Sequence, residues 1–141
     1  MAGYSGTPLE KKLGIKAEFN VAFVNAPENF VKQLDLPPGV NVKSISKSKS
    51  LDFIHVFVKS QKTLTAAFEC SRRMKPSGML WVSWPKKTSG VTTDVNENLV
   101  REVGLAAGLV DVKICAVDDV WSGLKFVYRL KDRPRISSLR A

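Results

Sequence analysis

The chain has 141 residues, of which 44% are hydrophobic and 25% charged, and its formal net charge is +9. This length and balance are typical of one globular domain that folds without disulfides or metals, and they exclude fibrous and disulfide-rich small proteins. No apolar run reaches the roughly 20 residues that span a bilayer, and residues 1–16 lack the apolar core of a signal peptide. We therefore expect a cytoplasmic protein with no membrane segment.

In chain order, the first half predicts three strands. The apolar run FNVAFVNA over residues 19–26 is typical of a strand, and residues 28–36 after it have helical spacing. Residues 40–45 alternate as a half-buried strand does. The near-continuous apolar run over residues 51–58 is typical of a strand that is buried on both faces of a parallel sheet.

The second half begins with a predicted helix from Ser60, which the turn Lys75-Pro76-Ser77-Gly78 ends. The next strand, MLWVSW, contains Trp81 and Trp84, whose side chains we expect on opposite faces of the sheet. Asp94 is predicted to cap a further helix, with Glu97 as its capping-box partner.

That helix is predicted to end at Gly108. Residues 110–117 and 123–130 then read as two strands with a short connection, which favours an antiparallel hairpin. The whole pattern predicts an α/β, Rossmann-like fold with a mixed sheet that is mainly parallel and closes with a C-terminal antiparallel hairpin. No internal repeat or second domain is visible.

We therefore predict a single domain over residues 19–130, with residues 1–18 packed on it. Residues 131–141 form a basic tail without apolar periodicity, which we expect to be disordered. The excess of Lys and Arg indicates an anionic partner, and a solvated charged surface is the alternative interpretation.

The two cysteines, Cys70 and Cys115, lie far apart in apolar surroundings. Their spacing matches neither a disulfide framework nor a metal site, so we expect two reduced, buried thiols and no metal.

Several stretches of the chain resemble class I S-adenosylmethionine-dependent methyltransferases. RRMKPSGMLWVSW resembles their helix, turn and strand, LDFIHVFV resembles the strand before it, and AGLVDVKICAVD with GLKFVYRL resembles their closing antiparallel pair. The whole chain more closely resembles a family of small, stand-alone bacterial proteins of unknown function. The segments GYSGTPLEKKLGI, NAPENF, WVSWPKKTSGVTTD and GLVDVKICAVDDVWSGLKFVYR carry that resemblance.

The chain departs from the methyltransferase pattern at two places. Those enzymes have a glycine-rich loop after the first strand, through which the backbone approaches the cofactor, whereas residues 25–29 here contain no glycine. Pro27 in this loop also lacks an N–H donor. The short passage from residue 45 to residue 51 leaves no room for the helix, strand and helix that complete the adenosine pocket in the enzymes. We therefore expect no cofactor.

Ligands in open α/β sheets bind outside the carboxyl ends of the parallel strands. The loop in WVSWPKKTSGVTTD supplies cations and hydroxyls there, and the helix after it supplies backbone N–H groups, which together suit an anion. A solvated loop and tryptophans that only pack in the core are the alternative interpretation. The candidate ligand-binding residues are Asn25, Lys59, Ser60, Trp84, Lys86, Lys87, Thr88, Ser89 and Trp121.

No catalytic residue is predicted. His55 is the one histidine and lies in mid-strand, where it reads as a core residue, and Asp118-Asp119 in the hairpin turn read as caps of backbone groups. The leading hypothesis is a non-catalytic or accessory module that binds a small anionic ligand or a protein partner at the strand ends. A divergent methyltransferase and a nucleic-acid-associated basic protein are the alternatives. An oligomer is left open.

Overall fold

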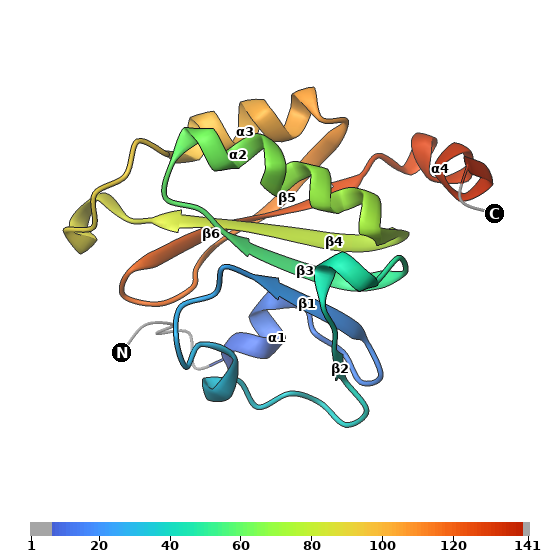
Figure 1. Cartoon of the computed structure of the whole chain (residues 1–141), viewed down its shortest axis with the longest axis horizontal. Coiled ribbons are helices and arrows are strands. Elements are labelled where there is room, and N and C mark those ends of the chain that lie inside the picture. Colours follow the sequence, from blue (N-terminus) through green and yellow to red (C-terminus); the bar gives the residue numbers. More distant parts are fainter. Residues whose placement is uncertain (1–6, 140–141) are drawn as a thin grey trace.

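The structure, a computed structural model, describes residues 7–139. A six-stranded sheet with the strand order β2-β1-β3-β4-β6-β5 forms the centre, and helices cover both of its faces (Figure 1). The strands are β1 (Asn20–Val24), β2 (Asn41–Val42), β3 (Leu51–Phe57), β4 (Met74–Pro85), β5 (Leu109–Ala116) and β6 (Trp121–Tyr128). The α-helices are α1 (Leu9–Leu13), α2 (Gln61–Glu69), α3 (Glu97–Ala106) and α4 (Arg133–Leu139). Short 3-10 turns are η1 (Val31–Gln33), η2 (Ile45–Lys47), η3 (Cys70–Arg73), η4 (Lys87–Ser89) and η5 (Leu130–Asp132).

The predicted fold class is confirmed. Strands β2, β1, β3 and β4 are parallel, β6 is antiparallel to β4, and β5 closes the sheet as the antiparallel partner of β6. The strand order reverses between β1 and β3, because the chain leaves β1 toward β2 on one side and leaves β3 toward β4 on the other.

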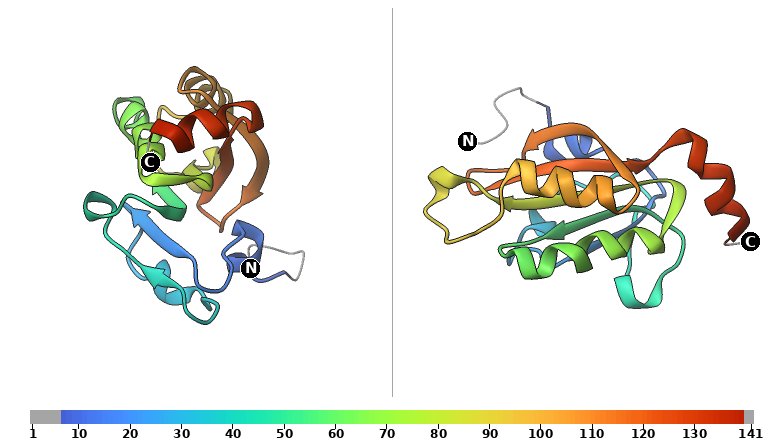
Figure 2. Two further views of the ribbon diagram at one scale, coloured as in Figure 1. Left: turned by 90° about the vertical axis from the view of Figure 1, so that its right-hand side faces the viewer. Right: turned by 90° about the horizontal axis from the view of Figure 1, so that it is seen from above.

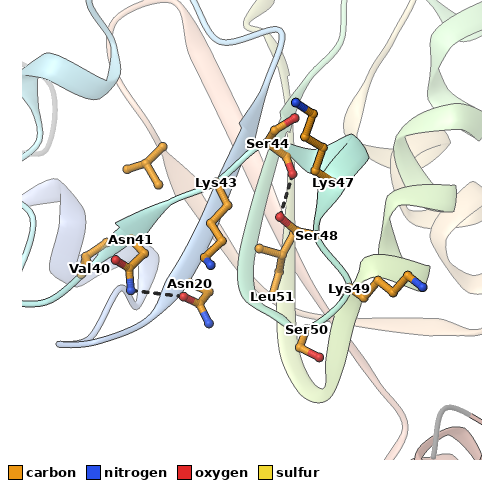
Figure 3. Close-up of a pocket in the computed structure, with 11 residues that line it drawn as sticks. Asn20, Val40, Asn41, Lys43, Ser44, Lys47, Ser48, Lys49, Ser50 and Leu51 are labelled. Carbon is orange, nitrogen blue, oxygen red and sulfur yellow. Dashed lines mark hydrogen bonds between the residues drawn. The ribbon is translucent and has the colours of Figure 1, made fainter.

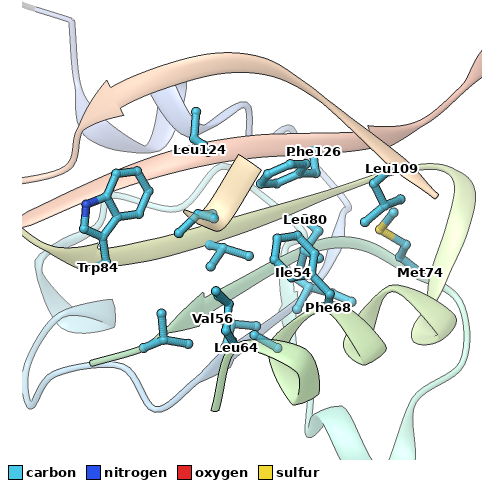
Figure 4. Packing of buried hydrophobic residues seen from close by; sticks show 14 of the residues in the cluster. Ile54, Val56, Leu64, Phe68, Met74, Leu80, Trp84, Leu109, Leu124 and Phe126 are labelled. Carbon is cyan, nitrogen blue, oxygen red and sulfur yellow. The ribbon is translucent and has the colours of Figure 1, made fainter. Parts of the chain in front are cut away.

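The face of the sheet under α2 and α3 holds the larger of two core clusters, which we call the α2-side cluster (Figure 4). Leu64 and Phe68 from α2 pack with Ile54 and Leu80 of the sheet, and the ring of Phe68 meets that of Phe126 edge to face at 4.9 Å. Gly104 of α3 is also required here, because a Cβ at this position would come within 2.3 Å of the Phe126 ring. The glycine therefore lets α3 lie directly on β6.

On the opposite face, α1 and η1 cover the second core cluster, which we call the aromatic cluster. Leu13 and Ile15 are buried against Trp81, whose Nε1 donates a hydrogen bond to the Leu13 carbonyl at 2.8 Å. Trp84, three residues on, belongs to the α2-side cluster instead. The two tryptophans thus point to opposite faces, as the alternation of a strand predicted.

The predicted helix over residues 28–36 is wrong, since only the 3-10 turn η1 forms there. Asn29 takes a left-handed φ of 68°, and Pro37 ends the segment, so too few residues remain for a stable α-helix. Phe30 and Leu34 still bury their side chains in the aromatic cluster. The strand predicted over 40–45 shortens to the two exposed residues of β2.

The predicted turn Lys75-Pro76-Ser77-Gly78 does not end α2, which stops at Glu69 and continues into η3. The four residues lie within β4 instead. Leu51 pairs with Met74 and Phe53 pairs with Met79, so residues 75–78 bulge opposite Asp52 alone. Gly78 is needed at the bulge, because a Cβ there would lie 3.0 Å from the Leu51 carbonyl oxygen.

The tail also differs from the expectation. Residues 133–139 form α4 where the sequence predicted disorder over 131–141, and Ile136 is only 7% exposed within the α2-side cluster. The sequence signal was weak because, among residues 133–138, one apolar side chain is buried and no periodic apolar face forms. Residues 140 and 141 lie outside the described part of the chain.

Candidate functional site

A cleft of about 580 Å³ opens at the carboxyl ends of β1 and β3, where the strand order reverses. This is the place at which open α/β sheets bind ligands. We call it the strand-end cleft. It is lined by Asn25, Ala26, Pro27, Phe57, Val58, Lys59, Ser60, Thr63, Val91, Val120 and Trp121.

The lining is largely apolar, with a few polar groups at one side. Phe57 and Trp121 meet edge to face at 5.0 Å and form an aromatic wall. Lys59 is exposed and is the one cation among the lining residues. The hydroxyl of Thr63 donates to the Ser60 carbonyl at 2.9 Å, which fixes the first turn of α2 beside the cleft.

Asp94 caps the N-terminus of α2, which differs from its predicted role. Asp94 was expected to cap the following helix, but its Oδ1 accepts the Gln61 N–H at 2.8 Å. Helix α3 begins later and is capped by Asn96, whose side chain accepts from Leu99 N at 2.9 Å. The carboxylate of Asp94 neutralises the positive end of α2, so the cleft depends on Lys59 for its positive charge.

The two lysines of the loop lie in a different hollow. Lys86 and Lys87 join Trp84 and the start of α3 around a groove of about 480 Å³, which we call the lysine groove. Glu97 also lines it, but its carboxylate is paired with Arg101, which donates to Glu97 Oε2 at 2.6 Å. The predicted combination of lysines with a helix N-terminus therefore exists, although not in the strand-end cleft.

The nine predicted residues thus separate into three groups. Asn25, Lys59, Ser60 and Trp121 meet in the strand-end cleft, while Trp84, Lys86 and Lys87 line the lysine groove. Thr88 and Ser89 line neither hollow.

The role of Ser89 is structural. Its Oγ donates to the Lys86 carbonyl at 2.6 Å and accepts from Val91 N at 3.2 Å, so the hydroxyl closes the turn η4. Trp84 is only 5% exposed, so most of its side chain packs in the core, as in the alternative interpretation.

The hairpin turn brings Trp121 to the strand ends. Because β6 is antiparallel to β4, its first residue Trp121 pairs with Pro85, the last residue of β4. Asp118 accepts from the N–H groups of Val120 and Trp121, both at 2.8 Å, so its predicted capping role is confirmed. The cap holds Val120 and Trp121 against the cleft.

His55 is a core residue, as predicted. It is fully buried, its Nε2 lies 2.7 Å from Ser83 Oγ, and its ring stacks on Phe57 at 4.2 Å. Its Nδ1 has no hydrogen-bond partner among the described residues. Burial lowers the pKa of His55 to about 3, so the imidazole is neutral at physiological pH.

Several cleft residues carried no recognisable sequence signal. Ala26, Pro27, Val91 and Val120 are ordinary apolar loop residues, and only the sheet order brings them together. Thr63 lies in the predicted helix from Ser60, where no local pattern singles it out. The strand-end rule identified the loops that meet but not which of their side chains face inward.

Solved structures with a similar fold include methyltransferases. The fibrillarin of Aeropyrum pernix, solved with natively bound S-adenosyl-L-methionine, matches with a TM-score of 0.62 and 11% identity over 82% of this chain and 69% of its own. A precorrin-6y C5,15-methyltransferase from Geobacter metallireducens matches with a TM-score of 0.61 and 10% identity over 86% of both chains. An S-adenosylmethionine-dependent methyltransferase from Aquifex aeolicus matches with a TM-score of 0.59 and 15% identity over 82% of this chain and 85% of its own. No family model and no curated protein sequence matches the chain.

The chain has a reduced class I methyltransferase fold. These identities establish the fold alone. The described part of the chain contains no helix that is both long and apolar enough to cross a membrane.

The loop after β1 differs from the glycine-rich loop that class I methyltransferases have after their first strand. Asn25 and Asn29 take left-handed φ values of 57° and 68°, so asparagine side chains stand where glycine would leave the backbone open. Ala26 and Pro27 themselves line the cleft, and Pro27 offers no N–H donor. From β2 the chain passes through η2 alone into β3, so no helix-strand-helix lies between them.

Proposed function

We propose that this protein is a non-catalytic or accessory module that binds a small ligand in the strand-end cleft. The observation that carries the proposal is the position of the cleft at the reversal of strand order between β1 and β3.

The lining indicates the class of ligand. An apolar, aromatic-walled cleft with a few convergent polar groups is typical of small-molecule sites. Phe57 and Trp121 favour a flat ring, while Lys59 favours one anionic group on it. Ser60 and Thr63 are exposed enough to hydrogen-bond a polar substituent, since both line the opening. The ligand class is therefore an anionic molecule with an aromatic ring, such as an aromatic carboxylate or a nucleoside monophosphate.

The proposal is tested by thermal unfolding with a panel of ring-containing anions and their neutral analogues. Charged ligands should raise the melting temperature with concentration, because binding stabilises the folded state by RT ln(1 + [L]/Kd). Lys59→Ala should weaken binding about 2- to 5-fold, the usual effect of one exposed charge. Thr63→Trp should abolish ligand binding, because the larger side chain fills the cleft from the surface of α2.

The double variant Lys86→Ala/Lys87→Ala serves as the matched control, because it removes lysines from the lysine groove and leaves the cleft intact. If this variant alone loses the response, the groove is the anion site. If no member of the panel stabilises the wild-type protein, the cleft is not a ligand site and the proposal fails.

The second candidate is a divergent S-adenosylmethionine-dependent methyltransferase, which the fold of the similar structures supports. The side chains of Asn25, Ala26 and Pro27, which line the cleft in place of glycines, argue against a methyltransferase. Calorimetric titration with S-adenosylmethionine should show no binding at micromolar concentration. Micromolar affinity that Thr63→Trp removes would replace the accessory role with the enzymatic one.

A further inference from the structure

The other end of the sheet, where the parallel strands begin, carries a concentration of positive charge. Two cavities of about 780 and 720 Å³ lie side by side there and share Lys49 and Ser50 as lining residues. We call their basic rim the strand-start surface. It comprises Lys43, Lys47, Lys49, Arg72, Arg73 and Lys75.

The residues come from two basic stretches, 43–49 and 72–75, which lie far apart in the sequence. Lys43, Lys47 and Lys49 surround the first cavity together with Ser44, Ser48 and Ser50 (Figure 3). The arginines follow α2, and Lys75 lies in the bulge of β4. Helix α4 lies at the same end of the molecule, which faces the viewer in the left view of Figure 2, and its Ser137 lines the second cavity.

The loop between β2 and β3 is held in place rather than left free. Arg73 Nη1 donates to the carbonyls of Ser46 and Ser48 at 3.2 and 3.3 Å, and Ser48 Oγ donates to the Ser44 carbonyl at 2.7 Å. These bonds fix the backbone from which Lys47 and Lys49 project. A charged ligand would therefore meet a pre-formed surface, which lowers the ordering cost of binding.

The positive charge is largely uncompensated. Among the ion pairs of residues 7–139, Lys75 with Asp52 at 2.9 Å is the one that involves this surface. The side chains of Lys43, Lys47 and Lys49 are exposed and have no acidic partner in that part of the chain. Such a surface attracts a polyanion rather than a single small anion.

We propose that the strand-start surface binds the phosphate backbone of a double-helical nucleic acid, independently of its base sequence. Lys and Arg together with Ser and Asn are the side chains that contact phosphates and sugars in such complexes. Asn20 and Asn41 line the first cavity beside the lysines. This activity is separate from ligand binding in the strand-end cleft, which lies at the opposite end of the strands.

A duplex fits better than a single strand, because single-strand binding relies on aromatic platforms for the bases. No Phe, Tyr, Trp or His lines either cavity. A membrane surface fits less well, because membrane-bound helices turn an apolar face outward. In α4 the apolar side chain of Ile136 instead points into the core.

The proposal is tested by fluorescence anisotropy with a labelled 20-base-pair duplex of arbitrary sequence, in DNA and RNA form, over a series of salt concentrations. Wild-type protein should bind with a Kd on the order of micromolar at low salt. Four contacts from Lys43, Lys47, Lys49 and Arg72 would give a slope of log K against log salt of about −3 to −4 on DNA. Lys47→Glu/Lys49→Glu should weaken binding about tenfold or more and make the slope shallower by about 2.

The matched control is Lys11→Glu/Lys62→Glu, which changes the net charge equally at exposed positions outside this surface. It should weaken binding less than about threefold, since only long-range attraction is lost. Circular dichroism and thermal unfolding show whether the charge-reversal variant folds. If it does not, Lys47→Gln/Lys49→Gln replaces it. That variant should also make the slope shallower by about 2.

Four outcomes would overturn the proposal. Equal losses in the test and control variants would mean that the overall charge of +9 attracts the duplex without a defined surface. Tighter binding to a single strand would point to base stacking elsewhere. Preference for vesicles with an anionic phospholipid over the duplex would identify a membrane surface. Absence of duplex binding at low salt would leave the surface without this partner.

Discussion

At the scale of single residues, His55 links burial to the pH dependence of folding. It lies between Phe57, on which its ring stacks, and Ser83, its one hydrogen-bond partner in the described structure. The unfolded chain takes up a proton at His55 near pH 6.5, whereas burial keeps the pKa of the folded protein at about 3. The contribution of His55 to the free energy of unfolding is therefore fully present above pH 6.5. The free energy of unfolding falls by up to about 1.4 kcal/mol per pH unit as the pH drops from 6.5 toward 3.

His55→Phe removes this proton linkage and keeps an aromatic side chain among Phe30, Phe53 and Phe57. The free energy of unfolding of the wild type, measured in urea, should fall between pH 7 and pH 5 by about 2 kcal/mol more than that of the variant. The imidazole signals of this one histidine should show a neutral ring at pH 5 in NMR spectra. An imidazole that titrates near pH 6.5 in the folded protein would contradict the buried assignment.

At the scale of elements, α4 is the segment whose importance the sequence understated. Ile136 packs at the edge of the α2-side cluster, and Arg133 Nε donates to the Tyr128 carbonyl at 3.2 Å. Ile136→Ala should lower the free energy of unfolding by about 2 kcal/mol, because it leaves a cavity in the core. The exposed neighbour Ser138 provides the control, since Ser138→Ala should change stability by less than about 0.5 kcal/mol. Equal melting temperatures for both variants would show that α4 is dispensable.

At the scale of the whole molecule, the sheet separates the two cysteines. Cys70 is half-buried and packs against the α2-side cluster, whereas Cys115 is buried in the aromatic cluster on the other face. The expectation of two buried thiols thus holds fully for Cys115 only. Thiols on opposite faces cannot reach the Cα separation of roughly 6 Å that a disulfide needs.

Reductant should therefore leave the melting temperature unchanged, and a thiol reagent should modify two cysteines per unfolded chain. In the folded protein, modification should be slow near neutral pH, because burial raises the pKa of both Cys70 and Cys115. A melting temperature that falls on reduction would show that the thiols are linked in a way that this fold does not allow.

The central strands and the fold class could be predicted from the sequence. The apolar runs that become β3 and β4 cannot avoid burial on both faces, and the two apolar segments after Gly108 are too close together for anything but a hairpin. The same local signals located α2 and α3. They failed where a tertiary contact replaced a local one. Asp94, predicted to cap the helix that follows it, instead accepts a hydrogen bond from the Gln61 N–H of α2.

Which functional side chains meet depends on the order and direction of the strands. Lys59 and Trp121 share a cleft because β6 runs antiparallel to β4, whereas Lys86 and Lys87 turn toward α3 and leave it. The strand-start surface combines the β2–β3 loop with η3 and the bulge of β4, which are far apart in the sequence. Periodicity reports which face of an element is buried, but the neighbours of a loop depend on strand order and register, which no local pattern encodes.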